Sequence, residues 1–238
     1  MDERLKTTLH TMLTMQEALN TRVGEDWRSR DLAWHRAIYV EAIEFLDHMG
    51  QWKWWSDERQ NLAAAQMELA DIWHFGLSMV LQSITPDEIE DAASIYSSWL
   101  EVSLNALPEK WQATVTPDTV CKLVDMLVAK AGNGAFSWRA FAGLLAATGL
   151  TVDGLYRLYA GKYALNCFRQ EHGYHTGDYD KQWGGETDES RLHAILAELP
   201  AEAVLPEAAL NALEAQYHLA VLTEQGFLRE PEAMLRSA

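Results

Sequence analysis

Apolar side chains recur every three to four residues along most of the chain, and this spacing limits its fold more than any other feature. In a helix, such spacing collects the apolar side chains on one face, whereas a strand requires strict alternation. We find no strand-like alternation. We therefore expect an all-α protein, with helices over about 3–20, 32–49, 59–83, 86–105, 117–131, 137–148, 151–171, 188–198 and 206–224.

The composition argues against several classes of function. The chain has 35 Asp and Glu residues against 19 Lys and Arg residues, and its formal net charge of −16 would repel nucleic-acid phosphates. No uncharged apolar run approaches the roughly 20 residues that span a bilayer, and the N-terminus lacks the apolar core of a signal peptide. Cys121 and Cys167 show no metal-ligand or CxxC spacing. We expect a cytoplasmic protein with reduced thiols that binds neither nucleic acid nor membranes.

Two carboxylate pairs, each with a spacing of three residues, lie in neighbouring predicted helices. Glu41 and Glu44 border an apolar stripe in VEAIEFLDHMGQWKWW (40–55), and Glu68 and Asp71 lie in a run that is apolar on nearly every side. Residues three apart share a helix face, with Cβ atoms about 5–6 Å apart. Burying carboxylates is costly unless they are paired or bind metal, and no Lys or Arg is near the second pair in sequence. Four carboxylates on two adjacent helices suit a hard cation such as Mg²⁺.

Two other interpretations of these carboxylates remain open. An ExxE pair on an amphipathic helix is more often solvated surface. Asp71 and His74 also form a DxxH, which would suit a di-iron carboxylate bundle. That bundle needs an ExxH from each of two helices, however, and His48 stands one position too late in the first helix.

A basic face precedes a glycine-containing segment near residue 173. Lys162, Asn166 and Arg169 lie at spacings of four and three, on one face of a predicted helix. Arg and Lys are the usual phosphate ligands, and flexible loops that carry them can close over a substrate. Alone, this segment would be interpreted as a solvated helix followed by a tethering loop. Together with the carboxylates, it predicts a phosphate-binding surface.

The segment GYHTGDYDKQWGGETD (173–188) looks too elaborate for a mere connector, because it combines four glycines with Tyr179 and Lys181. Arg169, Tyr179 and Lys181 have no evident acidic partner until phosphates arrive. We therefore expect this segment to be mobile without ligand and to become ordered when a nucleotide binds.

The chain resembles the all-α, dimeric dUTP diphosphatases, which are relatives of the MazG-type nucleotide pyrophosphohydrolases. The motifs that carry the resemblance are MQEALN (15–20), WHRAIYVEAIEFLD (34–47), WKWW (52–55), ELADIWHF (68–75), GKYALNCFRQEHGY (161–174) and GDYDKQWGGETD (177–188). The most specific mark is LNxFRQxxGY followed by GxYxKxW. The resemblance implies a homodimer with a helical-bundle core of the all-α NTP pyrophosphohydrolase type and additional helices. We expect one domain over 1–238, in which about 84–150 is a candidate mobile helical part.

The resemblance also implies roles for individual residues. Those expected to bind Mg²⁺, with Mn²⁺ as a substitute, are Glu41, Glu44, Glu68 and Asp71. Those expected to contact the nucleotide, chiefly its phosphates, are Lys162, Asn166, Arg169, Tyr179 and Lys181. Those expected at the nucleoside are Gln16, Asn20, Trp52 and Trp55, although core packing is an alternative role for the indoles. One departure from the family pattern is Thr187, which stands where a carboxylate is expected immediately before Asp188.

The implied activity is hydrolysis of dUTP, and of dUDP, to dUMP by Mg²⁺-dependent attack of water at the α-phosphorus. Glu44 is the candidate for orienting or deprotonating the water, and Glu41 is mainly a ligand. One alternative is a MazG-like pyrophosphohydrolase for dCTP or a modified nucleotide, because base selection depends on pocket geometry. Another is a non-catalytic helical interaction protein that binds a metal structurally.

Overall fold

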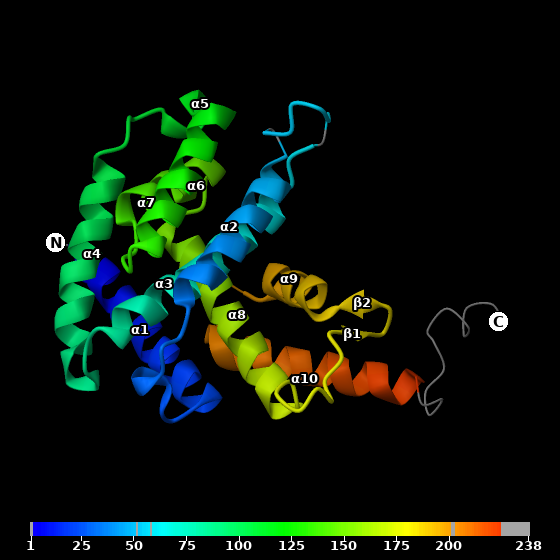
Figure 1. The fold of residues 1–238 in the computed structure, drawn as a ribbon. Helices are drawn as coiled ribbons and strands as arrows, with labels where there is room; N and C mark the ends of the chain where they lie inside the picture. The colour runs from blue at the N-terminus through cyan, green and yellow to red at the C-terminus, as the bar shows by residue number, and fades with distance from the viewer. Residues whose placement is uncertain (1, 51, 58, 201–202, 225–238) are drawn as a thin grey trace. The chain divides into compact units, whose positions relative to one another are not determined.

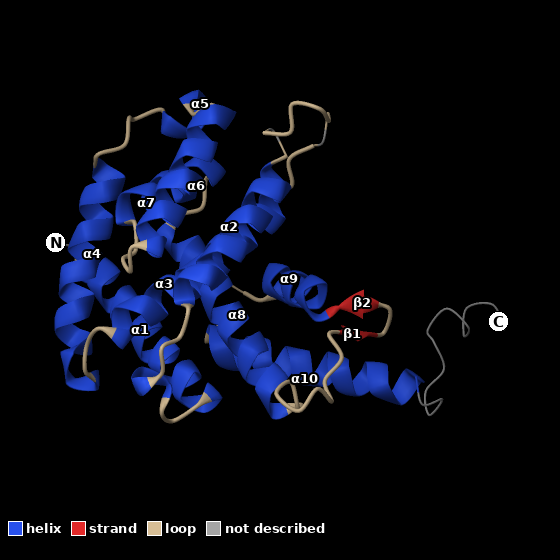
Figure 2. Ribbon diagram, viewed as in Figure 1, coloured by secondary structure: helices blue, strands red, loops and turns tan. Residues whose placement is uncertain are grey.

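The computed structural model describes residues 2–50, 52–57, 59–200 and 203–224, and helices account for most of it (Figures 1 and 2). The predicted all-α class is confirmed. The chain divides into two compact units, Met1–Tyr159 and Ala160–Ala238, and the boundary falls within α8 (Val152–Glu171). The single domain over 1–238 and the mobile part around 84–150 stay predictions.

The first unit contains the predicted helices, with ends within a few residues of those expected. Its elements are α1 (Glu3–Val23), η1 (Trp27–Ser29), α2 (Trp34–Met49), α3 (Leu62–Gln82), η2 (Pro86–Glu88), α4 (Ile89–Asn105), α5 (Trp111–Thr114), α6 (Pro117–Gly132), α7 (Trp138–Thr148) and the start of α8. Side-chain caps define several of the beginnings. The Asn61 side chain accepts a hydrogen bond from the amide of Ala64 at the start of α3, and Thr116 accepts one from Thr119 at the start of α6.

Helix α3 lies at the centre of the first unit, in contact with α1, α2 and α7. Its side chains are buried on nearly every side, as the apolar sequence of this helix predicts. The fully buried Trp73 stacks on Phe141 at a centroid distance of 4.9 Å, and the edges of Phe136 and Trp138 meet the same ring. This aromatic cluster holds α3 against α7 and the turn before it.

The second unit contains the rest of α8, a short hairpin and two further helices. The hairpin strands β1 (Gln182–Trp183) and β2 (Glu186–Thr187) precede α9 (Asp188–Glu198), and α10 (Leu205–Glu224) packs against α9 and β1. Gly184 and Gly185 form the hairpin turn with φ of 62° and 79°, a conformation that glycine adopts without strain. Strands of two residues are too short to show alternation, and for this reason the sequence did not predict the hairpin.

No helix in the described part of the chain combines the length and the apolar character that crossing a membrane would require.

Gly76 of α3 lies against the ring of Phe136. A Cβ added at Gly76 would lie 2.6 Å from Cε2 of that ring. Alanine favours a helix interior over glycine by about 1 kcal/mol, whereas overpacking a core costs about 1–3 kcal/mol. We expect Gly76→Ala to lower the free energy of unfolding by about 1–2 kcal/mol, measured by urea denaturation. Combining it with Phe136→Leu should relieve part of the penalty, and stabilisation by Gly76→Ala alone would contradict the tight contact.

Candidate functional site

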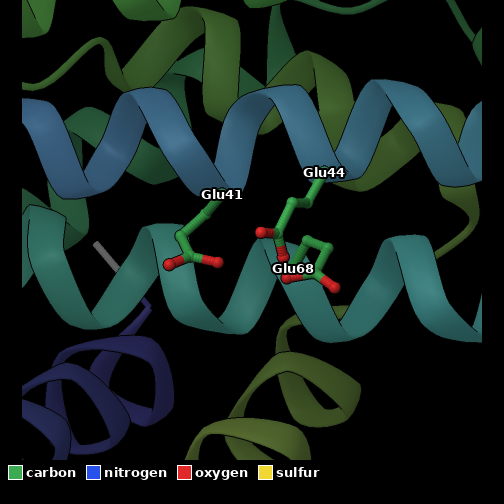
Figure 3. Close-up of side chains that lie close together, drawn as sticks. All are labelled: Glu41, Glu44 and Glu68. Carbon is green, nitrogen blue, oxygen red and sulfur yellow. The ribbon is translucent and has the colours of Figure 1, made fainter.

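Three carboxylates converge between α2 and α3 (Figure 3). Glu41 and Glu44 project from α2 toward α3, and Glu68 projects from α3; one carboxylate oxygen of each lies within 4.8 Å of the other two. Glu68 is buried, Glu41 is half-buried and Glu44 is exposed. Anions this close repel one another, so the arrangement favours a cation between them. Oxygen ligands at this spacing fit a divalent metal ion.

The apolar stripe of α2 produces this convergence. Ile38, Ala42 and Phe45 are fully buried where α2 packs along α3. Glu41 and Glu44 flank that stripe, so the packing that buries it also turns both carboxylates toward the neighbouring helix. The sequence pattern that predicted the helix therefore also positions its two acidic side chains.

The fourth predicted carboxylate, Asp71, lies about one turn beyond Glu68 on α3 and is half-buried. It is not among the three residues whose oxygens lie within 4.8 Å of one another. A residue that the sequence analysis did not choose contacts Glu68: Nε2 of His48 is 3.3 Å from Oε1 of Glu68. The available signal was spacing, since His48 follows Glu44 by four residues on α2 and shares its face.

Gln16 and Asn20 belong to a buried polar network that joins α1 to α3. The amide nitrogen of Gln16 donates to the side-chain oxygen of Asn20 at 2.9 Å, and Oε1 of Gln16 lies 2.7 Å from Nδ1 of His74. The amide nitrogen of Asn20 donates to the Ser78 hydroxyl at 3.2 Å, and the Tyr159 hydroxyl donates to Oε1 of Gln16 at 3.1 Å. Such a network fixes the side-chain amides in defined orientations.

Trp52 and Trp55 lie in the segment between α2 and α3, where they are 37% and 58% exposed. Their rings meet edge to face at a centroid distance of 5.3 Å. They are not core residues, which argues against the alternative role of the indoles. The segment joins α3 at Leu62, roughly 18 Å along the helix axis from His74. The segment that carries the two tryptophans therefore joins α3 far from the part of the helix that the Gln16 network contacts.

In the second unit, two buried cations share an acidic partner at the start of α9. Lys162 Nζ and Arg169 Nη2 each lie 3.0 Å from Oε1 of Glu189. Arg169 also forms a bidentate pair with the buried Asp188, through Nε at 2.8 Å and Nη2 at 2.9 Å. Burial would lower the pKa of Arg169, but the bonds and charge of Asp188 reverse that effect and raise it.

Tyr179 extends this arrangement into the 173–188 segment. Its hydroxyl donates to Oδ2 of Asp188 at 2.9 Å and accepts from the Trp183 indole at 3.1 Å. Burial raises the pKa of the Tyr179 hydroxyl, and the carboxylate that accepts its proton has the same effect. The expectation that Arg169 and Tyr179 lack an acidic partner before phosphates bind is therefore wrong, because the 173–188 segment returns Asp188 to both of them.

The start of α9 explains how the sequence analysis missed these partners. Thr187, which stands where a carboxylate was expected, is the N-cap of α9 and accepts a hydrogen bond from the amide of Ser190. Asp188 and Glu189 follow in the first turn, a position that favours acidic residues in any helix. Because acidic residues are common at this position, the sequence alone does not mark Asp188 and Glu189 as partners of buried cations.

The remaining predicted phosphate ligands are Asn166 and Lys181. Asn166 is half-buried on α8, and Lys181 is exposed, with its Nζ 5.6 Å from the centroid of the Tyr174 ring.

A family model described as dUTPase matches residues 8–174, well over half of the chain. The matched range includes the carboxylate cluster, the Gln16 network, the tryptophans and Arg169; it ends before Tyr179 and Asp188. None of the curated proteins matches the chain.

Proposed function

The chain belongs to the dUTPase family and is a dUTP diphosphatase, and we propose that it hydrolyses dUTP by metal-assisted attack of water at the α-phosphorus. The observation that carries this proposal is the convergence of Glu41, Glu44 and Glu68 within the matched range. The products would be dUMP and pyrophosphate. With dUDP the same attack would release phosphate.

We assign Mg²⁺ to this carboxylate cluster, with Mn²⁺ as a substitute. Glu41, Glu44 and Glu68 offer oxygen atoms at a spacing that a hard cation accepts, and Asp71 is proposed as a fourth ligand from the next turn of α3. The bound ion would neutralise phosphate charge and lower the pKa of a coordinated water. Glu44 is the most exposed of the clustered carboxylates, which suits a group that orients or deprotonates a water arriving from solvent.

The nucleotide ligands are proposed from the family resemblance and from their environments. Lys162 and Arg169 are buried cations of the kind that bind phosphate oxygens, and Asn166, Tyr179 and Lys181 would add polar contacts. The exposed Trp52 and Trp55 offer aromatic faces to the base. Gln16 and Asn20, whose amides are held by the α1–α3 network, would face the nucleoside.

We expect Glu44→Gln and Asp71→Asn to abolish most turnover while the fold remains intact, because each removes a ligand charge and keeps the side-chain shape. For Glu44, loss of a general base predicts a fall in kcat of roughly 10²–10⁴-fold. Steady-state rates of pyrophosphate release at varied Mg²⁺, together with circular dichroism, measure both effects. The matched control is Glu109→Gln, which makes the same charge change at an exposed site away from the cluster. Near-wild-type turnover in either variant would exclude the proposed metal site of four carboxylates.

The expected substrates are dUTP and dUDP, with dTTP and UTP rejected. A site anchored on the α- and β-phosphates does not need the γ-phosphate. The C5 methyl of thymine would be refused if the Trp52 and Trp55 wall leaves no room beside uracil C5, since one extra methyl is poorly tolerated in a packed pocket. UTP would be rejected if its ribose packs against an apolar surface, because a 2′-hydroxyl buried without a hydrogen-bond partner costs about 1–3 kcal/mol.

Values of kcat/KM for dUTP, dUDP, dTTP, dCTP and UTP test this specificity. Inert dUDP would contradict anchoring on the α- and β-phosphates. A preference for dCTP would favour the alternative, a MazG-like pyrophosphohydrolase that acts on dCTP or a modified nucleotide.

We propose that the enzyme is a homodimer. The resemblance implies this state, and α4 offers a candidate interface, because Ile95, Trp99 and Val102 form an exposed apolar stripe at helical spacing. Light scattering coupled to size exclusion should give the mass of two chains. Trp99→Glu should shift the population to monomer, whereas Met126→Glu, at an exposed apolar residue of α6, should not. A monomeric wild-type protein would overturn the proposal.

A further inference from the structure

Glu189 bridges the two buried cations of the second unit through a single oxygen atom. Oε1 lies 3.0 Å from both Lys162 Nζ and Arg169 Nη2. The two cationic side chains are only 4% and 9% exposed, whereas the side chain of Glu189 is 45% exposed. Among these three side chains, Glu189 is therefore the one that solvent reaches.

Asp188 contacts the same guanidinium in a different way. Its side chain is 1% exposed, it binds Arg169 through two parallel hydrogen bonds, and it accepts the Tyr179 hydroxyl. Removing a partner from a buried pair of this kind is costly. Asp188 thus orients the Arg169 guanidinium through two hydrogen bonds that do not involve Glu189.

Two cationic groups that meet at one oxygen form an arrangement that can also bind a phosphate oxygen. A carboxylate oxygen and a phosphate oxygen are equivalent acceptors for such donors, but a polyphosphate carries more negative charge. Burial would raise the pKa of Glu189, yet the charges of Lys162 and Arg169 lower it to about 2. Glu189 is accordingly an anion at neutral pH, and it competes with any other anion for the same donors.

We propose that Glu189 occupies the phosphate position of the nucleotide-free enzyme and is displaced into solvent when the polyphosphate of the substrate binds to Lys162 and Arg169. This inference rests on the proposed role of those two cations as phosphate ligands. Because a phosphate ligand must first displace Glu189 from Lys162 and Arg169, its apparent dissociation constant is higher than it would be without this carboxylate. The effect is to discriminate against weakly charged ligands, since only a polyphosphate supplies enough charge to replace the carboxylate readily.

The alternative role of Glu189 is purely structural. As an acidic residue in the first turn of α9, it interacts favourably with the helix dipole. A structural role predicts that its replacement lowers thermal stability and leaves phosphate affinity unchanged or weaker. Occupancy of the phosphate position predicts the opposite effect on affinity.

The test compares Glu189→Gln with Glu186→Gln, which makes the same charge change at an exposed residue of β2. Calorimetry at constant Mg²⁺ gives the dissociation constant of pyrophosphate, and initial rates give the KM for dUTP. We expect Glu189→Gln to tighten pyrophosphate binding and lower KM by about fivefold, the equivalent of about 1 kcal/mol for a partly exposed ion pair. Glu186→Gln should stay within about twofold of wild type, as is usual for surface changes.

Two further variants separate the possible outcomes. Glu189→Asp keeps the negative charge at the start of α9 and withdraws the carboxylate by one methylene, so it should also tighten pyrophosphate binding, and it serves if the glutamine variant folds poorly. Unchanged or weaker binding in the folded Glu189 variants would overturn the inference. Lys162→Gln tests the underlying proposal: weaker pyrophosphate binding supports it, whereas unaltered binding would refute the phosphate role of Lys162 and the inference with it.

Discussion

The carboxylate of Glu68 lies within α3, a helix that the first unit buries on nearly every side, and the candidate metal site depends on this burial. A buried anion requires compensation by hydrogen bonds or positive charge. The packing of α2 against α3 brings Nε2 of His48 to 3.3 Å from Oε1 of Glu68. It also places the carboxylates of Glu41 and Glu44 beside that of Glu68. The same packing that builds the core therefore gathers three carboxylates in one place.

The second unit also buries charged side chains, but two of them are cations. Lys162 and Arg169 are 3% and 7% exposed, and the start of α9 supplies the two acidic partners. These partners differ in burial even though they are adjacent in sequence. Asp188 is enclosed and also accepts the Tyr179 hydroxyl, whereas Glu189 reaches solvent. A helix start that places consecutive side chains in different surroundings can thus combine a fixed partner with an exchangeable one.

The 173–188 segment contributes to this electrostatic arrangement as well as connecting α8 to α9. Its aromatic side chains, Tyr179 and Trp183, hydrogen-bond to each other and pack around Phe168 and Tyr217. The glycines of the segment adopt positive φ, a conformation that glycine reaches without strain. The folded segment carries Asp188 back to Arg169.

Apolar periodicity determined the all-α class and placed the helix ends to within a few residues. Local caps such as Asn61 and Thr116 define where individual helices begin. The spacing of three likewise determined that Glu41 and Glu44 share a face. Pairing between distant residues was decided only by the tertiary structure. Neither the proximity of His48 to Glu68 nor the pairing of Arg169 with Asp188 follows from local pattern. His48 meets Glu68 because α2 packs against α3. Arg169 meets Asp188 because the 173–188 segment folds back toward α8. Helix propensity acts over a few residues, whereas the environment of a charge depends on every segment that packs around it.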